Sequence, residues 1–369
     1  MKKTLQKQRR RKISERFQIS NLKKGRFSPT FDAKKIKYEP MNKGMYLFVL
    51  LLMSACTSQT EGDKHQNSRE KVVNVKSEIK EIDTGNVLIG NSSNTYLSKD
   101  YLIITDYQAY DKVVHVFNKA DFHHLASFGT KGQGPYEITN MGHLITDEVR
   151  RKFYISDNSK YKIFSYDIDS VLAMPESYQQ QIKMNIKRDQ IPSDFHYVND
   201  TLCYGRIILP TSASTFDQHI GKWNMTTGDI KIIGEKHPEV HNKRTHLAVS
   251  MEKKMLVEAY YNYDLMNISD LDGNIQCYIY GPNWPTKGLE TFGEPLITPQ
   301  NILVPYSGEA RPTSKKRQIH IFDLKGNYEK TLNIGYDITH CCYDEQHHRL
   351  IFSFNDDIQF GYLDLKGII

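Results

Sequence analysis

Histidine and cysteine bind transition metals more often than other side chains do, and they are concentrated in HCCYDEQHH at residues 340–348. Cys341 and Cys342 are adjacent in a predicted strand, so their side chains point to opposite faces and cannot easily share one ion. His347 and His348 fall in the turn before the next predicted strand, and the Cys-x2-Cys spacing of zinc sites is absent. The stretch therefore predicts no metal site, and no other motif predicts a cofactor.

The glycine-rich run FGTKGQGPYE at residues 128–137 superficially resembles a phosphate-binding loop. Such a loop needs a strand before it and a helix after it, whereas Pro135 follows the glycines here and the next predicted element is another strand. We therefore expect the glycines to shape a turn, and we do not predict nucleotide binding. A direct ligand contact by Lys131 or Gln133 of this loop stays open.

Aromatic and basic side chains are frequent in or beside the loops that join predicted strands. Aromatic faces next to hydrogen-bonding groups suit sugars or peptides, and the loop-rich mouths of β-structures are common ligand sites. Together with Lys131 and Gln133, the candidate ligand-binding residues are Tyr107, Tyr110, Tyr161, Arg206, Tyr260, Tyr261 and Arg311. Tyrosine is also common on any β surface, so ordinary exposed strand ends are the alternative interpretation.

Cys56 is a candidate for lipidation rather than for catalysis. It follows an uncharged apolar run at residues 45–55, which is too short to span a bilayer and has the length of a signal-peptide core. The end of this run, MSAC, resembles the lipobox of bacterial lipoproteins, in which the cysteine sulfur receives a diacylglycerol and cleavage leaves that cysteine as the acylated N-terminus, with a fatty acid such as palmitate. The resemblance implies a signal peptide at 41–56 and a membrane anchor at Cys56. The alternative is a buried apolar strand followed by a free cysteine.

The charge of the chain is divided unevenly. Residues 1–40 hold 14 Lys+Arg against 3 Asp+Glu, a net charge of +11. The whole chain carries +6 and Lys43 adds +1, which leaves −6 for residues 57–369. We favour a translation start at Met41, with 1–40 an over-extended or disordered basic extension; a basic nucleic-acid arm is the alternative. A negatively charged body predicts no nucleic-acid partner.

One hairpin recurs along the rest of the chain and indicates its architecture. In each copy, an apolar strand is followed by an Asp or Asn. Two or three residues later comes Gly or a polar substitute, and then the next strand begins. The first turn residues are Asn118, Asp167, Asn224, Asp270, Asp323 and Asp364, at intervals of 41 to 57 residues. Asp and Asn bond their own backbone in tight turns, and Gly accepts the positive φ that follows. With two further strands before each hairpin, the pattern predicts an all-β, six-bladed β-propeller with four antiparallel strands per blade.

The two ends of this repeat predict how the ring closes. Only two residues follow Gly367, so the last blade lacks its outer strand. Residues 72–82, VVNVKSEIKEI, form an extra strand ahead of the first blade, with Val73, Val75 and Ile79 on one face. We therefore expect 72–369 to form the propeller, with its N-terminal strand completing the last blade. The polar residues 57–71 read as a flexible tether.

These features together resemble a known family. The lipobox, the hairpins and the positions Gly129, Gly132, Gly134, Pro135 and Glu137 are similar to those of the TolB-like six-bladed propeller lipoproteins of Bacteroides-type bacteria. The resemblance covers nearly all of residues 57–369. It implies the fold and an outer-membrane location, on the periplasmic side or at the cell surface, and it supplies no catalytic residue.

Two functions remain open at this point. The first is a non-enzymatic envelope lipoprotein that binds a glycan, a peptide or an envelope protein through its loop-rich face. The second is an envelope hydrolase or lyase acting on glycan or peptide, with its site in the central channel. No Ser-His-Asp order or nucleophile elbow appears, and the inner-strand candidates for acid–base chemistry are His143, Glu148 and His246. Converging carboxylates and histidines in the channel would favour an enzyme, whereas an aromatic or apolar lining would favour binding.

Overall fold

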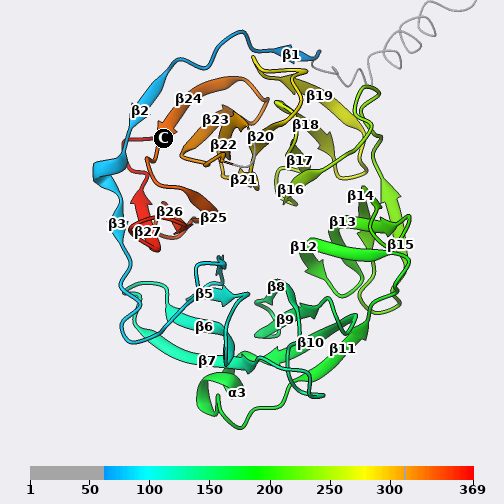
Figure 1. Cartoon of the computed structure of the whole chain (residues 1–369), viewed down its shortest axis with the longest axis vertical. Coiled ribbons are helices and arrows are strands. Elements are labelled where there is room, and N and C mark those ends of the chain that lie inside the picture. The colour runs from blue at the N-terminus through cyan, green and yellow to red at the C-terminus, as the bar shows by residue number, and fades with distance from the viewer. Residues whose placement is uncertain (1–61, 311–312) are drawn as a thin grey trace, which may run out of the picture. The chain divides into compact units, whose positions relative to one another are not determined.

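The computed structural model describes residues 62–310 and 313–369. These residues form six β-sheets arranged as the blades of a ring (Figure 1). The six-bladed propeller with four antiparallel strands per blade is therefore confirmed. Within each blade the strands follow one another in sequence order, from the channel outward. Because every blade repeats this order, the innermost strands run in the same direction along the ring axis.

The strand bounds of the first three blades are as follows. Blade one contains β4 (Ser93–Leu97), β5 (Tyr101–Asp106), β6 (Lys112–Asn118) and β7 (His124–Thr130). Blade two contains β8 (Met141–Asp147), β9 (Lys152–Asp157), β10 (Lys162–Asp167) and β11 (Gln181–Asn185). Blade three contains β12 (Ile191–Asn199), β13 (Leu202–Pro210), β14 (Phe216–Trp223) and β15 (Ile230–Ile233).

The other three blades are built in the same way. Blade four contains β16 (Thr245–Ser250), β17 (Met255–Tyr260), β18 (Leu265–Asp270) and β19 (Ile275–Tyr280). Blade five contains β20 (Leu289–Phe292), β21 (Leu296–Ile297), β22 (Asn301–Ala310), β23 (Gln318–Asp323) and β24 (Tyr328–Asn333), with β20 and β21 both paired to β22. Blade six contains β25 (Ile338–Asp344), β26 (Arg349–Phe354) and β27 (Phe360–Asp364).

The hydrophobic core lies mainly between neighbouring blades. The second strands of the blades are largely buried, and β26, with the sequence RLIFSF, is buried along its whole length. Its side chains alternate between the two faces of the sheet, so they pack against both neighbouring blades. Phe128 of blade one, for example, packs on Phe153 and Tyr166 of blade two, with ring centroids 5.7 and 4.9 Å apart. Each blade therefore depends on its neighbours, which is why the sheets close into a ring.

Four of the six recurring Asp/Asn turns form hairpins as predicted, and the turn at Asp364 forms without a strand after it. At Asp270 the carboxylate accepts hydrogen bonds from the backbone N–H groups of Asp272 and Asn274 at 2.8 and 2.9 Å, and Gly273 adopts a φ of +86°. In blade two, Asp167 instead caps the short helix α3 (Ile168–Ala173), accepting from the Ser170 N–H at 2.9 Å. The prediction of a hairpin there was wrong, because the same Asx hydrogen bond also starts a helix.

The N-terminal residues complete the ring, although along a longer path than expected. Strand β3 (Lys80–Glu81) pairs antiparallel with β27 and so provides the fourth strand of blade six. A 3-10 turn at Lys76–Glu78 separates it from β2 (Val72–Asn74), which pairs in parallel with β24 of blade five. Residues 72–82 are therefore two short strands that serve two blades, not one continuous strand. Val75 is fully buried, whereas Val73 is 39 % exposed.

The segment before β2 also lies on the blades. Strand β1 (Lys64–His65) pairs in parallel with β19 of blade four, and Arg69 forms an ion pair with Asp264. Residues 64–69, which we expected to belong to a tether, therefore extend the outer edge of the propeller, and residues 1–61 with Cys56 lie outside the described residues. No helix in the described part of the chain is long and apolar enough to cross a membrane.

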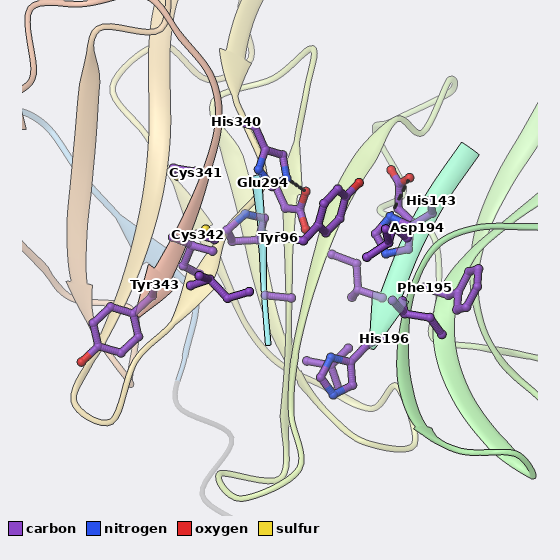
Figure 2. A pocket seen from close by; sticks show the side chains of 18 of the residues that line it. Tyr96, His143, Asp194, Phe195, His196, Glu294, His340, Cys341, Cys342 and Tyr343 are labelled. Carbon is purple, nitrogen blue, oxygen red and sulfur yellow. Dashed lines mark ion pairs between the residues drawn. The ribbon is translucent and has the colours of Figure 1, made fainter. Parts of the chain in front are cut away.

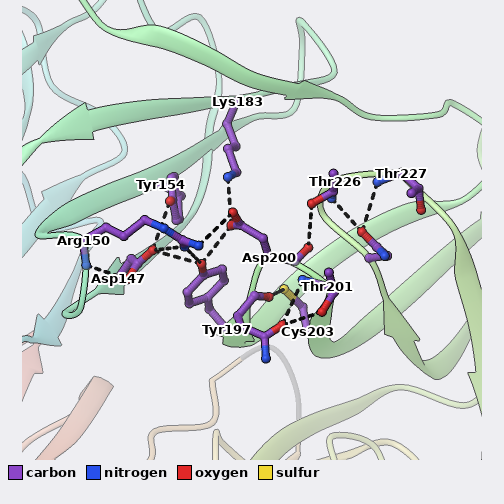
Figure 3. A network of polar contacts seen from close by, with 12 residues as sticks. Asp147, Arg150, Tyr154, Lys183, Tyr197, Asp200, Thr201, Cys203, Thr226 and Thr227 are labelled. Atoms are coloured by element: carbon purple, nitrogen blue, oxygen red, sulfur yellow. Dashed lines mark hydrogen bonds and ion pairs between the residues drawn. The ribbon is translucent and has the colours of Figure 1, made fainter.

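A polar network joins blades two and three at the turns that follow their inner strands (Figure 3). The Tyr197 hydroxyl lies 2.9 Å from carboxylate oxygens of both Asp147 and Asp200. Arg150 donates to Asp147 at 2.8 Å, and Lys183 donates to Asp200 at 2.8 Å. The carboxylates are thus neutralised by cations from blade two, and the network joins the two blades.

Candidate functional site

Two cavities lie along the propeller axis in the described part of the chain. Their volumes are about 400 and 250 Å³, and both are lined by residues of the innermost strands or the segments beside them. The cavities share Tyr96, His143, Asp194, Glu294, His340 and Cys341 (Figure 2). Each of the six blades contributes one polar or aromatic side chain here, with blade four represented by His246, which lines only the smaller cavity. We call this set the channel ring; it comprises Tyr96, His143, Asp194, His246, Glu294 and His340.

Breaks in strand register place several of these side chains in the channel. The pairing of β12 with β13 skips Asp194, which has a φ of +42°, a conformation that is rare outside glycine. The pairing of β8 with β9 shifts at His143, and that of β25 with β26 shifts just before His340. Glu294 lies between β20 and β21, where the inner strand of blade five is interrupted. Such bulges re-aim side chains and are common beside functional sites.

The charged members of the ring interact in pairs. His340 Nε2 lies 3.3 Å from Glu294 Oε2, while its Nδ1 lies 3.4 Å from the Thr95 hydroxyl. Asp194 forms an ion pair with Arg206 from β13, and its carboxylate also lies 3.8 Å from His143 Nδ1. The ring therefore combines an acid–histidine pair with an acid–arginine pair on opposite sides of the channel.

Burial and the neighbouring charges set the protonation states in the ring. Burial alone raises the pKa of Glu294, but the hydrogen bond with His340 and the nearby histidines lower it to about 2. Burial lowers the pKa of His143 to about 4 and that of His246 to about 3. At neutral pH, Glu294 is therefore ionised, and His143 and His246 are neutral imidazoles with one donor and one acceptor each.

Three of the predicted ligand-binding residues reach this site. The Tyr107 hydroxyl lies 3.1 Å from that of Tyr96, a member of the ring. Tyr261 lines the smaller cavity, with its ring centroid 6.1 Å from that of His246. Arg206 reaches the ring through its ion pair with Asp194.

The other predicted ligand-binding residues lie elsewhere. Tyr110 and Gln133 are exposed, and Lys131 donates to the Tyr107 carbonyl at 3.4 Å. Tyr161 stacks beneath the Arg188 guanidinium at 4.9 Å. Tyr260 is fully buried in the core of blade four, so the prediction that it lies on the rim was wrong: its position in a strand turns it away from the neighbouring, channel-lining Tyr261. Arg311 lies outside the described residues.

The glycine-rich run forms a closed turn rather than an anion cradle. The Glu137 carboxylate accepts from the Gly134 N–H at 2.7 Å, and a Cβ added at Gly132 would lie 2.0 Å from the same carboxylate. The Lys160 ammonium donates to the carbonyls of Gly134 and Glu137 at 2.5 Å each. The loop's own side chain therefore occupies the space that an anion would need, which agrees with a structural role for the glycines.

Sequence reasoning named only part of the ring. His143 and His246 were anticipated on inner strands, but Glu148 lies in the turn after β8, where it accepts from the Lys99 N–H at 3.1 Å, outside the channel. Asp194, Glu294 and His340 were not identified as site residues. In the described residues, no group of three or more His, Cys, Asp or Glu side chains is arranged to hold a metal ion.

Comparison with known proteins is consistent with this architecture. A DUF4221-family protein from Bacteroides vulgatus has a TM-score of 0.55 at 10 % identity, with 78 % of this chain and 95 % of that chain covered. A Bacteroides fragilis protein thought to be exported has a TM-score of 0.51 at 12 % identity, with coverages of 82 % and 98 %. Virginiamycin B lyase from Staphylococcus aureus has a TM-score of 0.51 at 11 % identity, with coverages of 77 % and 98 %. These likenesses establish the fold alone.

At the level of sequence, no curated protein matches this chain. A family model does match, over residues 82–272, from the end of the closing segment to the third strand of blade four. The chain belongs to this family, DUF5128, the 6-bladed beta-propellers.

Proposed function

We propose that this protein is an exported, lipid-anchored propeller that binds a ligand in its central channel. The observation that supports this most directly is the channel ring, in which each blade contributes one polar or aromatic side chain; five of the six line both cavities, and His246 lines the smaller one. Ligand sites are typically concave, with a few convergent polar groups that fix orientation. The proposed ligand is a glycan, a peptide or a segment of an envelope protein.

The chemistry of the ring supports recognition by hydrogen bonds. Neutral imidazoles, an ionised Glu294 and the paired Asp194 offer acceptors, and the imidazoles and Arg206 offer donors. Tyr96 and Tyr261 add aromatic faces on which sugars or peptide side chains can pack. Because most charges are already matched within the protein, the ring favours a polar but uncharged group.

The Glu294–His340 pair supports a second candidate, an envelope hydrolase or lyase. A carboxylate that holds an imidazole at 3.3 Å can orient it and stabilise its protonated form during general base catalysis. The lyase from Staphylococcus aureus shares only the fold with this chain, so this candidate rests on the pair itself. Binding is favoured because both imidazole nitrogens of His340 already have partners within the protein.

The proposal is tested by ligand-induced thermal shifts of the purified protein. The probes are neutral mono- and disaccharides and short peptides, applied to the wild type and to Glu294→Gln. We expect at least one probe to raise the melting temperature of the wild type and to lose this effect in Glu294→Gln. Glu148→Gln, outside the channel, is the matched control and should keep it. If no probe distinguishes the ring variant from the control, channel binding is excluded for these classes; probe turnover lost in Glu294→Gln would favour the enzyme.

A further inference from the structure

The polarity of the residues that line the channel changes along its axis. Beyond the channel ring, the smaller cavity is lined by polar groups such as Asn94, Glu290 and Lys316. The larger cavity is lined on its other side mainly by aliphatic and aromatic side chains, again one from each blade, with Thr146 and His196 beside them. These residues form a second level, which we call the apolar ring; it comprises Leu97, Ile145, Tyr197, Val249, Ile297 and Tyr343.

The spacing along the inner strands explains why two rings exist. Ile145 lies two residues after His143, and Val249 lies three after His246. Ile297 likewise lies three residues after Glu294. Because the inner strands run in the same direction and rise about 3.3 Å per residue, five members of the apolar ring lie roughly 7–10 Å further along the axis than the channel ring, whereas Leu97, one residue after Tyr96, lies only about 3 Å further.

The members of the apolar ring offer little hydrogen bonding to a ligand. The Tyr197 hydroxyl is committed to Asp147 and Asp200, and the Tyr343 hydroxyl lies 3.0 Å from His348 Nδ1. Both tyrosines therefore present mainly their ring faces. Leu97, Val249 and Ile297 pack against the interblade core on one side but are only partly buried, and they line the cavity. Apolar ligand surface placed here gains about 25 cal/mol for each Å² removed from water.

The charges above the apolar ring restrict the polar end of a ligand. Glu294 and Asp194 are both carboxylates, and only Asp194 has an arginine partner. Lys316 lines the smaller cavity and forms an ion pair with Glu290. A carboxylate head at the channel ring would add a like charge beside Glu294, whereas a hydroxyl-bearing head would donate to Glu294 and to the imidazoles.

We propose that the ligand of the channel is an amphiphile, with an uncharged, hydroxyl-bearing head at the channel ring and an apolar chain in the apolar ring. This inference rests on the proposed function and specifies its ligand class. The larger cavity, of about 400 Å³, has room for a short alkyl chain, which adds about 0.8 kcal/mol for each methylene removed from water.

Three probes with matched parts test this inference by calorimetry. They are n-octyl β-D-glucoside below its critical micelle concentration, methyl β-D-glucoside with the same head but no chain, and octanoate with a similar chain but an anionic head. We expect the octyl glucoside to bind about tenfold tighter than the methyl glucoside, or better, and also tighter than octanoate.

Two variants of the apolar ring separate its effect from that of the head. Val249→Thr keeps the shape of the side chain but adds a hydroxyl, and Leu97→Gln makes the same test from another blade. Each variant should bind octyl glucoside several-fold more weakly than the wild type does and should bind methyl glucoside equally well. Val149→Thr, at a position 95 % exposed in the turn after β8, is the matched control and should change neither. Circular dichroism of each variant establishes that it is folded.

The outcomes distinguish this inference from the proposed function. If the two glucosides bind equally and both are lost in Glu294→Gln, the apolar chain has no role and only the proposed function stands. If octanoate binds as tightly as octyl glucoside, the uncharged head is refuted. If Val149→Thr weakens octyl glucoside as much as Val249→Thr does, binding is at the surface and the inference fails. If none of the three probes binds, or none responds to Glu294→Gln, this inference fails, whereas the proposed function is decided separately by the thermal shifts with saccharides and peptides.

Discussion

The Arg69 guanidinium lies 2.8 Å from the Asp264 carboxylate, although 195 residues separate the two in sequence. The side chains are 5 % and 0 % exposed, so the pair is buried. The guanidinium also lies against the rings of Phe292 and Tyr306, at 5.5 and 5.3 Å from their centroids. The segment ahead of the first blade is therefore tied to blades four and five by a desolvated ion pair, in addition to its short parallel strands.

Arg69→Ala is expected to destabilise the propeller by about 3 kcal/mol, because it leaves a buried carboxylate without its cation. The Asn283 N–H and the Tyr306 hydroxyl, each 3.2 Å from Asp264, compensate only in part. Urea unfolding measures the effect. Glu70→Ala, on the adjacent exposed residue, is the control and should change the free energy of unfolding by less than about 0.5 kcal/mol. Equal stability of the two variants would show that the pair contributes nothing.

Val75→Ala is expected to lower the free energy of unfolding by about 2 kcal/mol, because it removes buried methyl groups from the core between blades five and six and leaves a cavity. Val73→Ala, two residues earlier and 39 % exposed, should cost far less.

Deletion of residues 72–82 removes β3 as well and exposes the edge of β27. The deletion variant should therefore lose cooperative unfolding. An unchanged melting curve for the deletion would disprove the closure.

The repeat made the propeller predictable, because each hairpin carries its own local signal, such as Asp270 with Gly273. The path of the N-terminal segment carried no such signal. Strands β1 and β2 are two and three residues long and pair in parallel with distant strands. Arg69 lies in a polar run that reads as a tether, and only the tertiary contact with Asp264 makes it a buried residue.

The site was less predictable than the fold, for a related reason. Strand alternation assigns a side chain to a face only while the register is regular. Asp194, Glu294 and His340 all lie at or beside irregularities in their inner strands, so alternation could not assign them to the channel. A φ of +42° at Asp194 has no sequence signal, because aspartate is also common in ordinary turns.

Cys56→Ala is expected to release the protein from membranes, because the proposed thioether-linked diacylglycerol can form only on that sulfur. Fractionation of cells, followed by mass analysis of the N-terminal peptide, checks this. The wild type should yield an acylated peptide that begins at Cys56. Cys203→Ser, in the core of blade three, is the control and should remain membrane-bound. Continued partitioning of the Cys56 variant into membranes would refute the anchor, and a mature peptide from residues 1–40 would refute the start at Met41.

Acidification is expected to destabilise the propeller from about pH 6.5 downward, which is the ordinary histidine pKa. Burial lowers the native-state pKa of His246 to about 3 and that of His143 to about 4. Between those values and 6.5 the unfolded chain binds protons that the native state excludes, so stability falls as pH falls and is constant above this window. Each such histidine lowers the free energy of unfolding by up to about 1.4 kcal/mol for each pH unit of acidification within this window. Glu294, with a native pKa of about 2, adds a loss of the same sign only below about pH 4.3.

Urea unfolding of the wild type and of His246→Asn at pH 7.0, 6.0 and 5.0 isolates the contribution of the channel. These values lie above the range in which Glu294 protonates, so the difference between the two proteins reports the histidine. The variant should lose less stability on acidification than the wild type does. His115, whose pKa burial lowers to about 4, retains its own contribution in both proteins. His241→Asn, at an exposed position, is the matched control and should keep the slope of the wild type. If His246→Asn and His241→Asn have the same slope, His246 is already solvated in the native channel, and the ring does not exclude protons as proposed.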